Sequence, residues 1–110
     1  MKRIIFTAGY LENDDELTKM KGHRSDVLVE KEGGLYFELN FIDLQRLEVE
    51  LNSNMEKGRN YYTDTGLILV DQVSKDSIVK AVIGLDQKNF FFTQKPLKIT
   101  PEEQWFYIDY

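Results

Sequence analysis

A pair of adjacent glycines, Gly33 and Gly34, constrains this sequence more than any other feature. Glycine adopts positive φ angles without steric cost, and tight β-hairpin turns require such angles. Apolar residues alternate with other residues on both sides of the pair, over residues 26–31 and 35–42. A period of two is typical of a strand with one buried face. The segment therefore predicts an antiparallel hairpin with Phe37 in the core.

Two segments after the hairpin have the patterns of amphipathic helices. The first spans residues 43–57, between a capping Asp43 and Gly58, and its apolar residues recur at helical spacing: Leu44, Leu47, Leu51 and Met55. Leu47, Val49 and Leu51 also alternate as in a strand, but the composition of the segment favours a helix. The second helix is expected from Ser74 to about Gln87, with an apolar stripe of Ile78, Ala81, Val82 and Leu85, widened by Val79 and Ile83.

The remaining segments give shorter or ambiguous patterns. Residues 2–6 predict a short strand, and the continuous apolar run in residues 66–70 predicts a central strand covered on both faces. Four segments leave two alternatives each: 9–25 (a long loop, or one with a short helix at 14–20), 60–64 (turn or edge strand), 89–92 (strand or docked loop) and the tail 105–110 (strand, or helix beginning at Thr100). A strand at 89–93 would complete a right-handed crossover.

Together these elements predict one α+β domain over residues 1–110. We expect a mixed, mainly antiparallel sheet with two helices packed chiefly on one face. The absence of cysteine favours a reducing compartment. The apolar run of residues 4–8 is too short for a secretory signal, and no window is long and apolar enough for a membrane span. A cytoplasmic protein without membrane contact is the resulting expectation.

Most familiar catalytic groups are missing from the chain. It has no cysteine, one histidine, no phosphate-binding glycine pattern and no Gly-x-Ser-x-Gly motif. His23 could act as a general base oriented by Asp26, although a solvated loop histidine among cations is the commoner situation. The acidic run of residues 12–16 lacks the alternating ligands and central glycine of a calcium loop. We therefore expect no catalytic residue, no cofactor and no metal.

The charge distribution indicates a different kind of function. The net charge is −5, and residues 35–66 contribute −3 of it, with six acidic and three basic side chains. Such a chain is repelled by nucleic-acid phosphates and attracts a basic protein partner. The candidate partner-binding residues are acids that would steer association and residue types that dominate interface energies: Glu12, Asp14, Asp15, Glu16, Glu48, Glu50 and Asp64, with Arg59, Tyr61, Tyr62 and Trp105 as anchors.

In these features the sequence resembles the small acidic immunity proteins that bacteria pair with secreted toxins. The residues that carry the resemblance are Glu12, Asp14, Asp15, Glu16, Glu48, Glu50, Tyr61, Tyr62 and Asp64. The resemblance implies a non-enzymatic inhibitor that occludes a basic toxin surface. Two alternatives stay open. One is a small ligand-binding or enzymatic domain with a cleft beside Arg59, Tyr61 and Asp64. The other is a homo-oligomeric structural subunit whose interface is the wide apolar stripe of the second helix, which includes Val79 and Ile83. The sequence leaves the oligomeric state undetermined.

Overall fold

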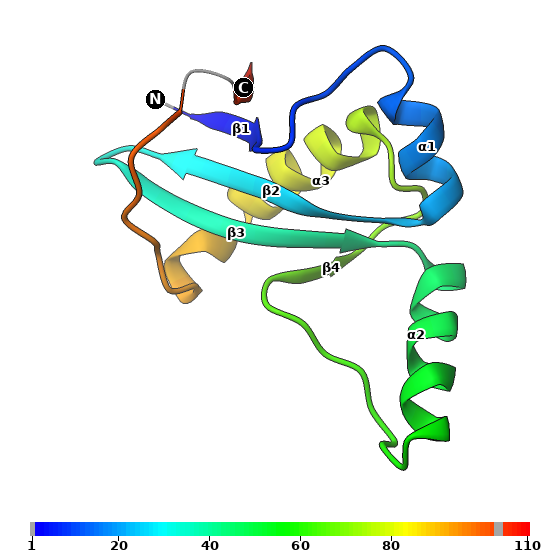
Figure 1. Cartoon of the computed structure of the whole chain (residues 1–110). Helices are drawn as coiled ribbons and strands as arrows, with labels where there is room; N and C mark the ends of the chain where they lie inside the picture. Colours follow the sequence, from blue (N-terminus) through cyan, green and yellow to red (C-terminus); the bar gives the residue numbers. More distant parts are fainter. Residues whose placement is uncertain (1, 103–104) are drawn as a thin grey trace.

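The computed structural model describes residues 2–102 and 105–110, which form a mixed five-stranded sheet with three α-helices (Figure 1). The strands lie in the order β4-β3-β2-β1-β5, and only β3 and β4 are parallel. Their bounds are β1 Arg3–Phe6, β2 His23–Lys31, β3 Leu35–Ile42, β4 Leu67–Leu69 and β5 Phe106–Asp109. The helices are α1 Asp14–Lys21, α2 Leu44–Glu56 and α3 Lys75–Gln87, with a 3₁₀ helix η1 at Phe90–Thr93. The predicted α+β class is confirmed.

The predicted hairpin is present as β2 and β3. These strands pair antiparallel, with Val29 opposite Phe37, and both turn glycines have positive φ angles of 84° and 71°. Phe37 is 5% exposed and lies in the core, as expected. Strand β2 begins three residues earlier than predicted, at His23, and its register shifts between Arg24 and Val27.

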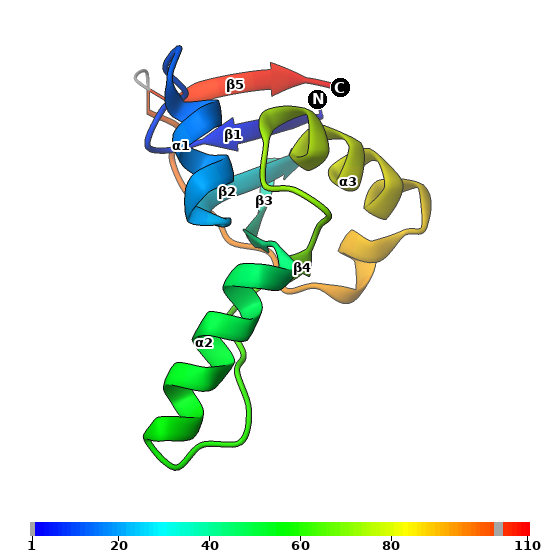
Figure 2. The same cartoon turned by 90° about the vertical axis from the view of Figure 1, so that its right-hand side faces the viewer.

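The hairpin is buried on both faces, whereas its period-two pattern predicted one buried face. One face carries the main core, to which β1, the hairpin and α3 contribute buried side chains such as Phe6, Phe37 and Val82. On the other face Ile5, Leu28 and Tyr36 are buried under Trp105 and Tyr107. The chain after η1 crosses this second face on its way to β5 (Figures 1 and 2). A segment distant in sequence therefore covers a face that the local pattern assigned to solvent.

The prediction of a central strand at residues 66–70 is wrong. Strand β4 lies at the edge of the sheet, and among the described residues it pairs only with β3, over Asn40–Leu67 to Ile42–Leu69. Ile68 packs against the main core, while Leu69 is exposed. A short apolar run is found both in central strands, which have a neighbour on each side, and in edge strands that pack one face on the core. The sequence pattern therefore does not separate the two.

Only one of the two predicted helices packs on the sheet. Helix α3 begins where Ser74 accepts a hydrogen bond from the Ser77 amide at 3.2 Å, and it buries Ile78 and Val82. Helix α2 forms where predicted, but it projects away from the sheet and none of its residues is buried (Figure 2). The expectation of two helices on one face is therefore wrong for α2.

The ambiguous segments are resolved as follows. Residues 14–21 form the short helix α1, residues 60–64 have no regular structure, and the tail is the strand β5, paired with β1. Phe90–Thr93 is a 3₁₀ helix, so the alternative strand at 89–93 and its crossover are wrong. Phe91 packs against Phe37 with ring centroids 5.2 Å apart. The helical turn expected after Thr100 includes residues 103–104, which lie outside the described residues. None of the described helices is both long and apolar enough to span a membrane.

Candidate functional site

Residues 43–66 form an arm that projects from the sheet. It consists of α2 and the irregular segment that returns beside it to β4 (Figures 1 and 2). At its tip, Asn54 Nδ2 donates to the Tyr61 carbonyl oxygen at 2.9 Å, and the Arg59 amide donates to the Asn54 carbonyl oxygen at 2.9 Å. Gly58 makes the turn with a φ of 86°. The two sides of the arm are thus fastened to each other at the end far from the sheet.

The root of the arm is fixed to the end of α1. Asp43 caps α2 by accepting from the Arg46 amide at 2.8 Å, and its own amide donates to the Gly22 carbonyl oxygen at 2.9 Å. Arg46 donates to the Lys21 carbonyl oxygen at 3.1 Å and to Glu50 at 2.8 Å. A Cβ on Gly22 would meet the Asp43 carboxylate at 2.7 Å, and Gly22 has a φ of 71°. The sequence thus brings α1 and α2 end to end in a defined arrangement.

The outer face of α2 is exposed and partly apolar. At 100° per residue, its exposed residues fill one continuous arc: Leu44, Gln45, Glu48, Val49, Asn52, Met55 and Glu56. Val49 and Met55 are 57% and 56% exposed. A helix of 13 residues is marginal in water without packing. Helix α2 nevertheless leaves three apolar side chains exposed, Leu44, Val49 and Met55, while Leu47 and Leu51 are half-buried.

This outer face continues onto α1. Met20, on the last turn of α1, is 82% exposed. A shallow hollow of about 270 Å³ lies between the two helices, and both Met20 and Val49 line it. Methionine side chains are flexible and adapt to varied partner surfaces. We define the docking face as the exposed residues of α2 together with Met20.

The inner side of the arm root holds a polar cluster. Asn40, which is buried, donates to Asp64 at 2.6 Å. Burial raises the pKa of Tyr62, and the nearby Asp64 and Glu50 carboxylates raise it further. Burial, with the Arg46 charge, lowers the pKa of His23, which favours neutral imidazole. The residues come from β2, β3 and both sides of the arm, so no local sequence pattern could have grouped them.

The predicted acidic residues divide into engaged and exposed ones. Asp15 accepts hydrogen bonds from Tyr10 and from the Lys75 amide, which ties α1 to the start of α3. The hydrogen bond from Tyr10, followed by that from Lys75, lowers the pKa of Asp15. Asp14 accepts from the Leu11 amide at 2.7 Å, within its own turn. The exposed acids are Glu12, Glu16, Glu48 and Asp64, of which Asp64 also accepts from Asn40. Glu50 is half-buried and paired with Arg46.

The predicted anchor residues also separate. Arg59 and Tyr61 are exposed on the return segment of the arm, whereas Tyr62 is half-buried in it. Trp105 packs against the small cluster on the second face of the sheet, beside β5, and is not part of the arm. The three residues of the alternative ligand-binding cleft do not converge on a common site. Arg59 and Tyr61 are exposed to solvent, and Asp64 accepts a hydrogen bond from Asn40.

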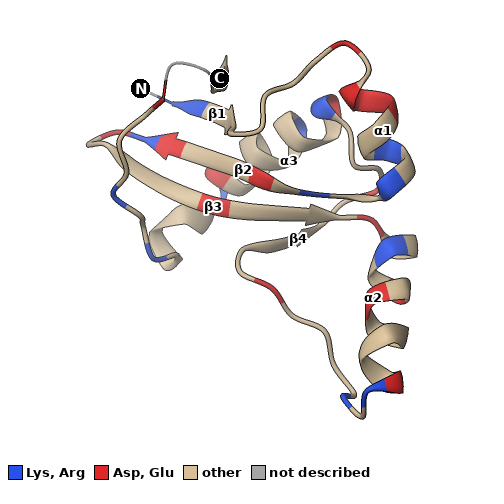
Figure 3. Cartoon of the chain, in the orientation of Figure 1, with Lys and Arg blue, Asp and Glu red and all other residues tan. Residues whose placement is uncertain are grey.

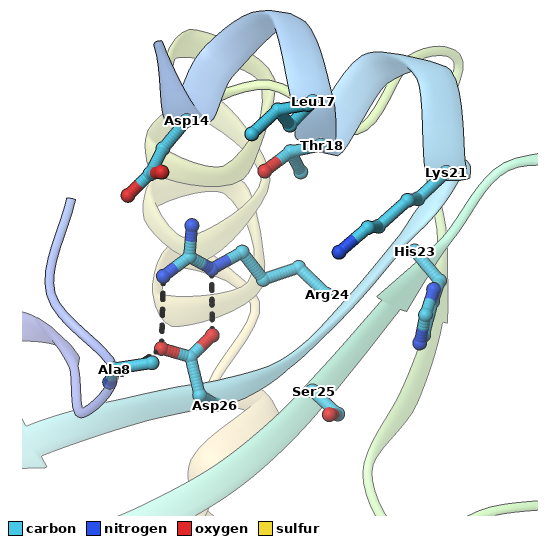
Figure 4. Close-up of a pocket in the computed structure, with 9 residues that line it drawn as sticks. All are labelled: Ala8, Asp14, Leu17, Thr18, Lys21, His23, Arg24, Ser25 and Asp26. Atoms are coloured by element: carbon cyan, nitrogen blue, oxygen red, sulfur yellow. Dashed lines mark hydrogen bonds and ion pairs between the residues drawn. The ribbon is translucent and has the colours of Figure 1, made fainter. Parts of the chain in front are cut away.

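A second hollow, of about 340 Å³, lies between α1 and β2 (Figure 4). Within it the Arg24 guanidinium donates to both oxygens of Asp26, at 2.6 and 2.9 Å, and the Ala8 amide donates to Asp26 at 2.8 Å. His23 points away from this ion pair (Figure 4). Asp26 therefore does not orient His23 as a general base. Within the described residues, no group of three metal-ligating side chains is placed to hold a metal ion.

No family model, curated protein or solved structure matches the chain. Figure 3 shows how the acidic and basic residues are distributed over the elements described above.

Three carboxylates outside the docking face are tied into the fold. Glu30 is nearly buried and accepts from Arg3 and from the Tyr36 hydroxyl at 2.8 Å, and the hydrogen bond from Arg3 lowers its pKa. Burial alone would raise the pKa of Asp86, but hydrogen bonds from Lys31 and Lys2 outweigh it and lower that pKa. Asp15 is the third such group.

We expect the free energy of unfolding to fall on acidification. A carboxylate with a lowered native pKa stabilises the fold above its unfolded pKa, near 4, and this contribution is lost as the pH falls through the native value. The three carboxylates should make stability decline below about pH 5. The lowered pKa of His23 adds a shallower decline that begins near the unfolded histidine pKa of about 6.5. Urea unfolding at a series of pH values measures the profile. Glu30→Gln should reduce stability at pH 7 and flatten the decline, whereas Glu32→Gln, at the exposed hairpin turn, should leave the profile unchanged.

Proposed function

We propose that this chain is a non-enzymatic protein-binding module that engages its partner through the docking face. The observation that carries the proposal is that α2, all of whose residues the structure describes, forms on a projecting arm without burying a residue. Apolar side chains that stay in contact with water add little to the stability of the free protein. The same side chains would stabilise a complex in which a partner covers them. A partner groove that receives α2 would supply the missing packing.

Charge defines the chemistry of that partner. The seven exposed residues of α2 include two acids, Glu48 and Glu56, and no base. The arm as a whole holds five acids and three bases, and Arg46 is already paired with Glu50. Surfaces of opposite charge steer association, so the partner surface should be basic with an apolar centre. In its most concrete form, the proposal is an immunity-type inhibitor, acting in the cytoplasm, that occludes the basic surface of a toxin.

Binding should depend on apolar residues of the arm. The partner to test is the protein encoded by the reading frame adjacent to this gene, with binding measured by surface plasmon resonance. Val49→Asp and Met55→Asp should each weaken binding at least ~10-fold, mainly through faster dissociation, because a charge replaces a desolvated apolar contact. The matched control is Phe92→Asp, which changes a side chain that is 85% exposed and outside the arm.

The acidic residues should act on the rate of association. Glu48→Lys should slow association and flatten its dependence on salt, because long-range attraction is screened by ions. If Phe92→Asp weakens binding and the arm variants do not, the proposal that the partner binds the docking face is wrong. A partner that binds through the arm but is harmless to cells lacking this chain would refute the immunity-type function and leave the binding module.

A further inference from the structure

A second surface lies at the opposite side of the molecule from β4, along the free edge of β5. In the described structure β5 pairs with β1 alone and ends the sheet (Figure 2). The Tyr110 amide donates to the Lys2 carbonyl oxygen at 3.2 Å. Hydrogen-bonding positions alternate along antiparallel strands. The backbone groups of Tyr107 and Asp109 are therefore directed outward, where a further strand could bind them.

A groove runs beside this edge on the α3 side. It has a volume of about 440 Å³, with Val79, Ile83 and Ile108 as its apolar lining and Lys75, Asp76 and Lys80 as its charged lining. Ile83 is partly exposed there. The groove is continuous with the face of β5 that bears Phe106 and Ile108, which pack against the main core. The edge thus combines unpaired backbone groups with uncovered apolar side chains.

We propose that this edge is the interface of a symmetric homodimer, in which β5 pairs antiparallel with β5 of a second copy. The two sheets would then form one continuous sheet. Opposite residues on antiparallel strands point to the same face, so Ile108 must meet an apolar residue of the same face. If Ile108 lies opposite Ile108 of the second copy, Tyr107 of each copy lies opposite Asp109 of the other. Both outward-directed residues of each copy are then paired.

The register explains why the occupant is a second copy. The alternative register, with Tyr107 opposite its own copy, would leave Asp109 opposite Trp105 and less completely paired. Helix α3 runs alongside β5 in the same direction, since Lys75 lies 5.9 Å from the Phe106 ring and Asp86 contacts Lys2 at 3.2 Å. Two α3 helices would therefore be antiparallel across the axis.

That antiparallel arrangement places groove residues of one copy against those of the other. The apolar lining of each groove, Val79 and Ile83, then lies beside the two-fold axis on the same face of the joined sheet. This is the self-complementarity that a two-fold interface requires. The edge at β4 offers no equivalent, because β4 has three residues and Leu97 pairs farther along the same side of β3, at Tyr36.

The interface would be small. A strand of four residues and one helix face bury less than the ~800 Å² per partner of a stable complex, so we expect a dimer with a dissociation constant in the micromolar range. This interface does not involve the arm. The two proposals therefore succeed or fail separately.

Sedimentation equilibrium of the purified chain tests the dimer. Over concentrations from about 5 to about 500 µM, the mass should rise from 13.0 kDa towards twice that value. Asp109→Pro removes one outward-directed amide from an exposed position and should weaken dimerisation at least ~10-fold. Its matched control, Asp109→Ala, keeps the amide and should dimerise like the parent chain. Ile83→Lys should also prevent dimerisation, because it places a charge in the apolar groove and leaves the backbone edge of β5 unchanged.

Hydrogen exchange locates the interface independently of any variant. The Tyr107 and Asp109 amides should become protected as concentration rises, while amides of the arm should not change. Unchanged thermal unfolding of Asp109→Pro at low concentration would show that the variant folds. A mass of 13.0 kDa throughout the range overturns the proposal. So does a dimer that survives both Asp109→Pro and Ile83→Lys, or one that Val49→Asp dissociates.

Discussion

Replacing Phe37 with alanine should lower the free energy of unfolding by ~3–5 kcal/mol. Phe37 is 5% exposed, lies opposite Val29 in the hairpin and contacts the Phe91 ring. Alanine would remove the whole buried ring and leave a cavity between β3 and η1, which the surrounding core could fill only in part. Urea unfolding followed by circular dichroism measures the loss.

The matched control for this substitution is Phe92→Ala. Phe92 is a neighbour of Phe91 in η1, but its side chain is 85% exposed. Its removal should change the free energy of unfolding by less than ~0.5 kcal/mol. Equal losses for the two variants would contradict the description of which η1 side chain enters the core.

Replacing Gly66 with alanine should cost about 2–4 kcal/mol. Gly66 joins the return segment of the arm to β4 and has a φ of 62°. A Cβ at this position would lie 2.1 Å from the Glu38 carbonyl oxygen and 3.1 Å from the Leu39 Cα, so backbone must move. The Asn40 amide, which donates to the Gly66 carbonyl oxygen at 2.9 Å, would lose its partner as β4 shifts from β3.

Gly58→Ala separates this clash from backbone strain alone. Gly58 has a φ of 86° at the tip of the arm, and no atom lies within 4 Å of the position of its Cβ. We expect a loss of about 1–2 kcal/mol, which is the cost of the left-handed conformation for a residue with a Cβ. Thermal unfolding of the two variants under one set of conditions compares them. A loss for Gly58→Ala as large as that for Gly66→Ala would show that β4 tolerates displacement.

Gly66→Ala also bears on the proposed function. The Asn40–Asp64 hydrogen bond lies two residues before Gly66 at the root of the arm. A displaced return segment would change the angle at which α2 leaves the sheet. Partner binding should weaken in this variant even at temperatures where the chain remains folded, whereas homodimerisation through β5 should persist.

The local sequence determined those elements whose signals are encoded within a few residues. Gly33 and Gly34 specified the hairpin turn because few other residues accept its φ angles. Asp43 and Ser74 specified the starts of α2 and α3, since each side chain accepts a hydrogen bond from an amide three residues later. The absence of cysteine and the single histidine likewise restricted the chemistry available to the chain.

Tertiary structure decided which of these elements is covered, and by what. The pattern of α2 is that of a core helix, yet its root contacts at Gly22 and Lys21 direct it away from the sheet. The apolar run at β4 reads as a central strand, but only β3 is beside it. Burial depends on contacts between segments distant in the chain, whereas periodicity records only which residues share a face. For that reason the sequence could specify the apolar stripe of α2, but only the fold showed that Leu47 and Leu51 are half-buried while Leu44 and Met55 are exposed.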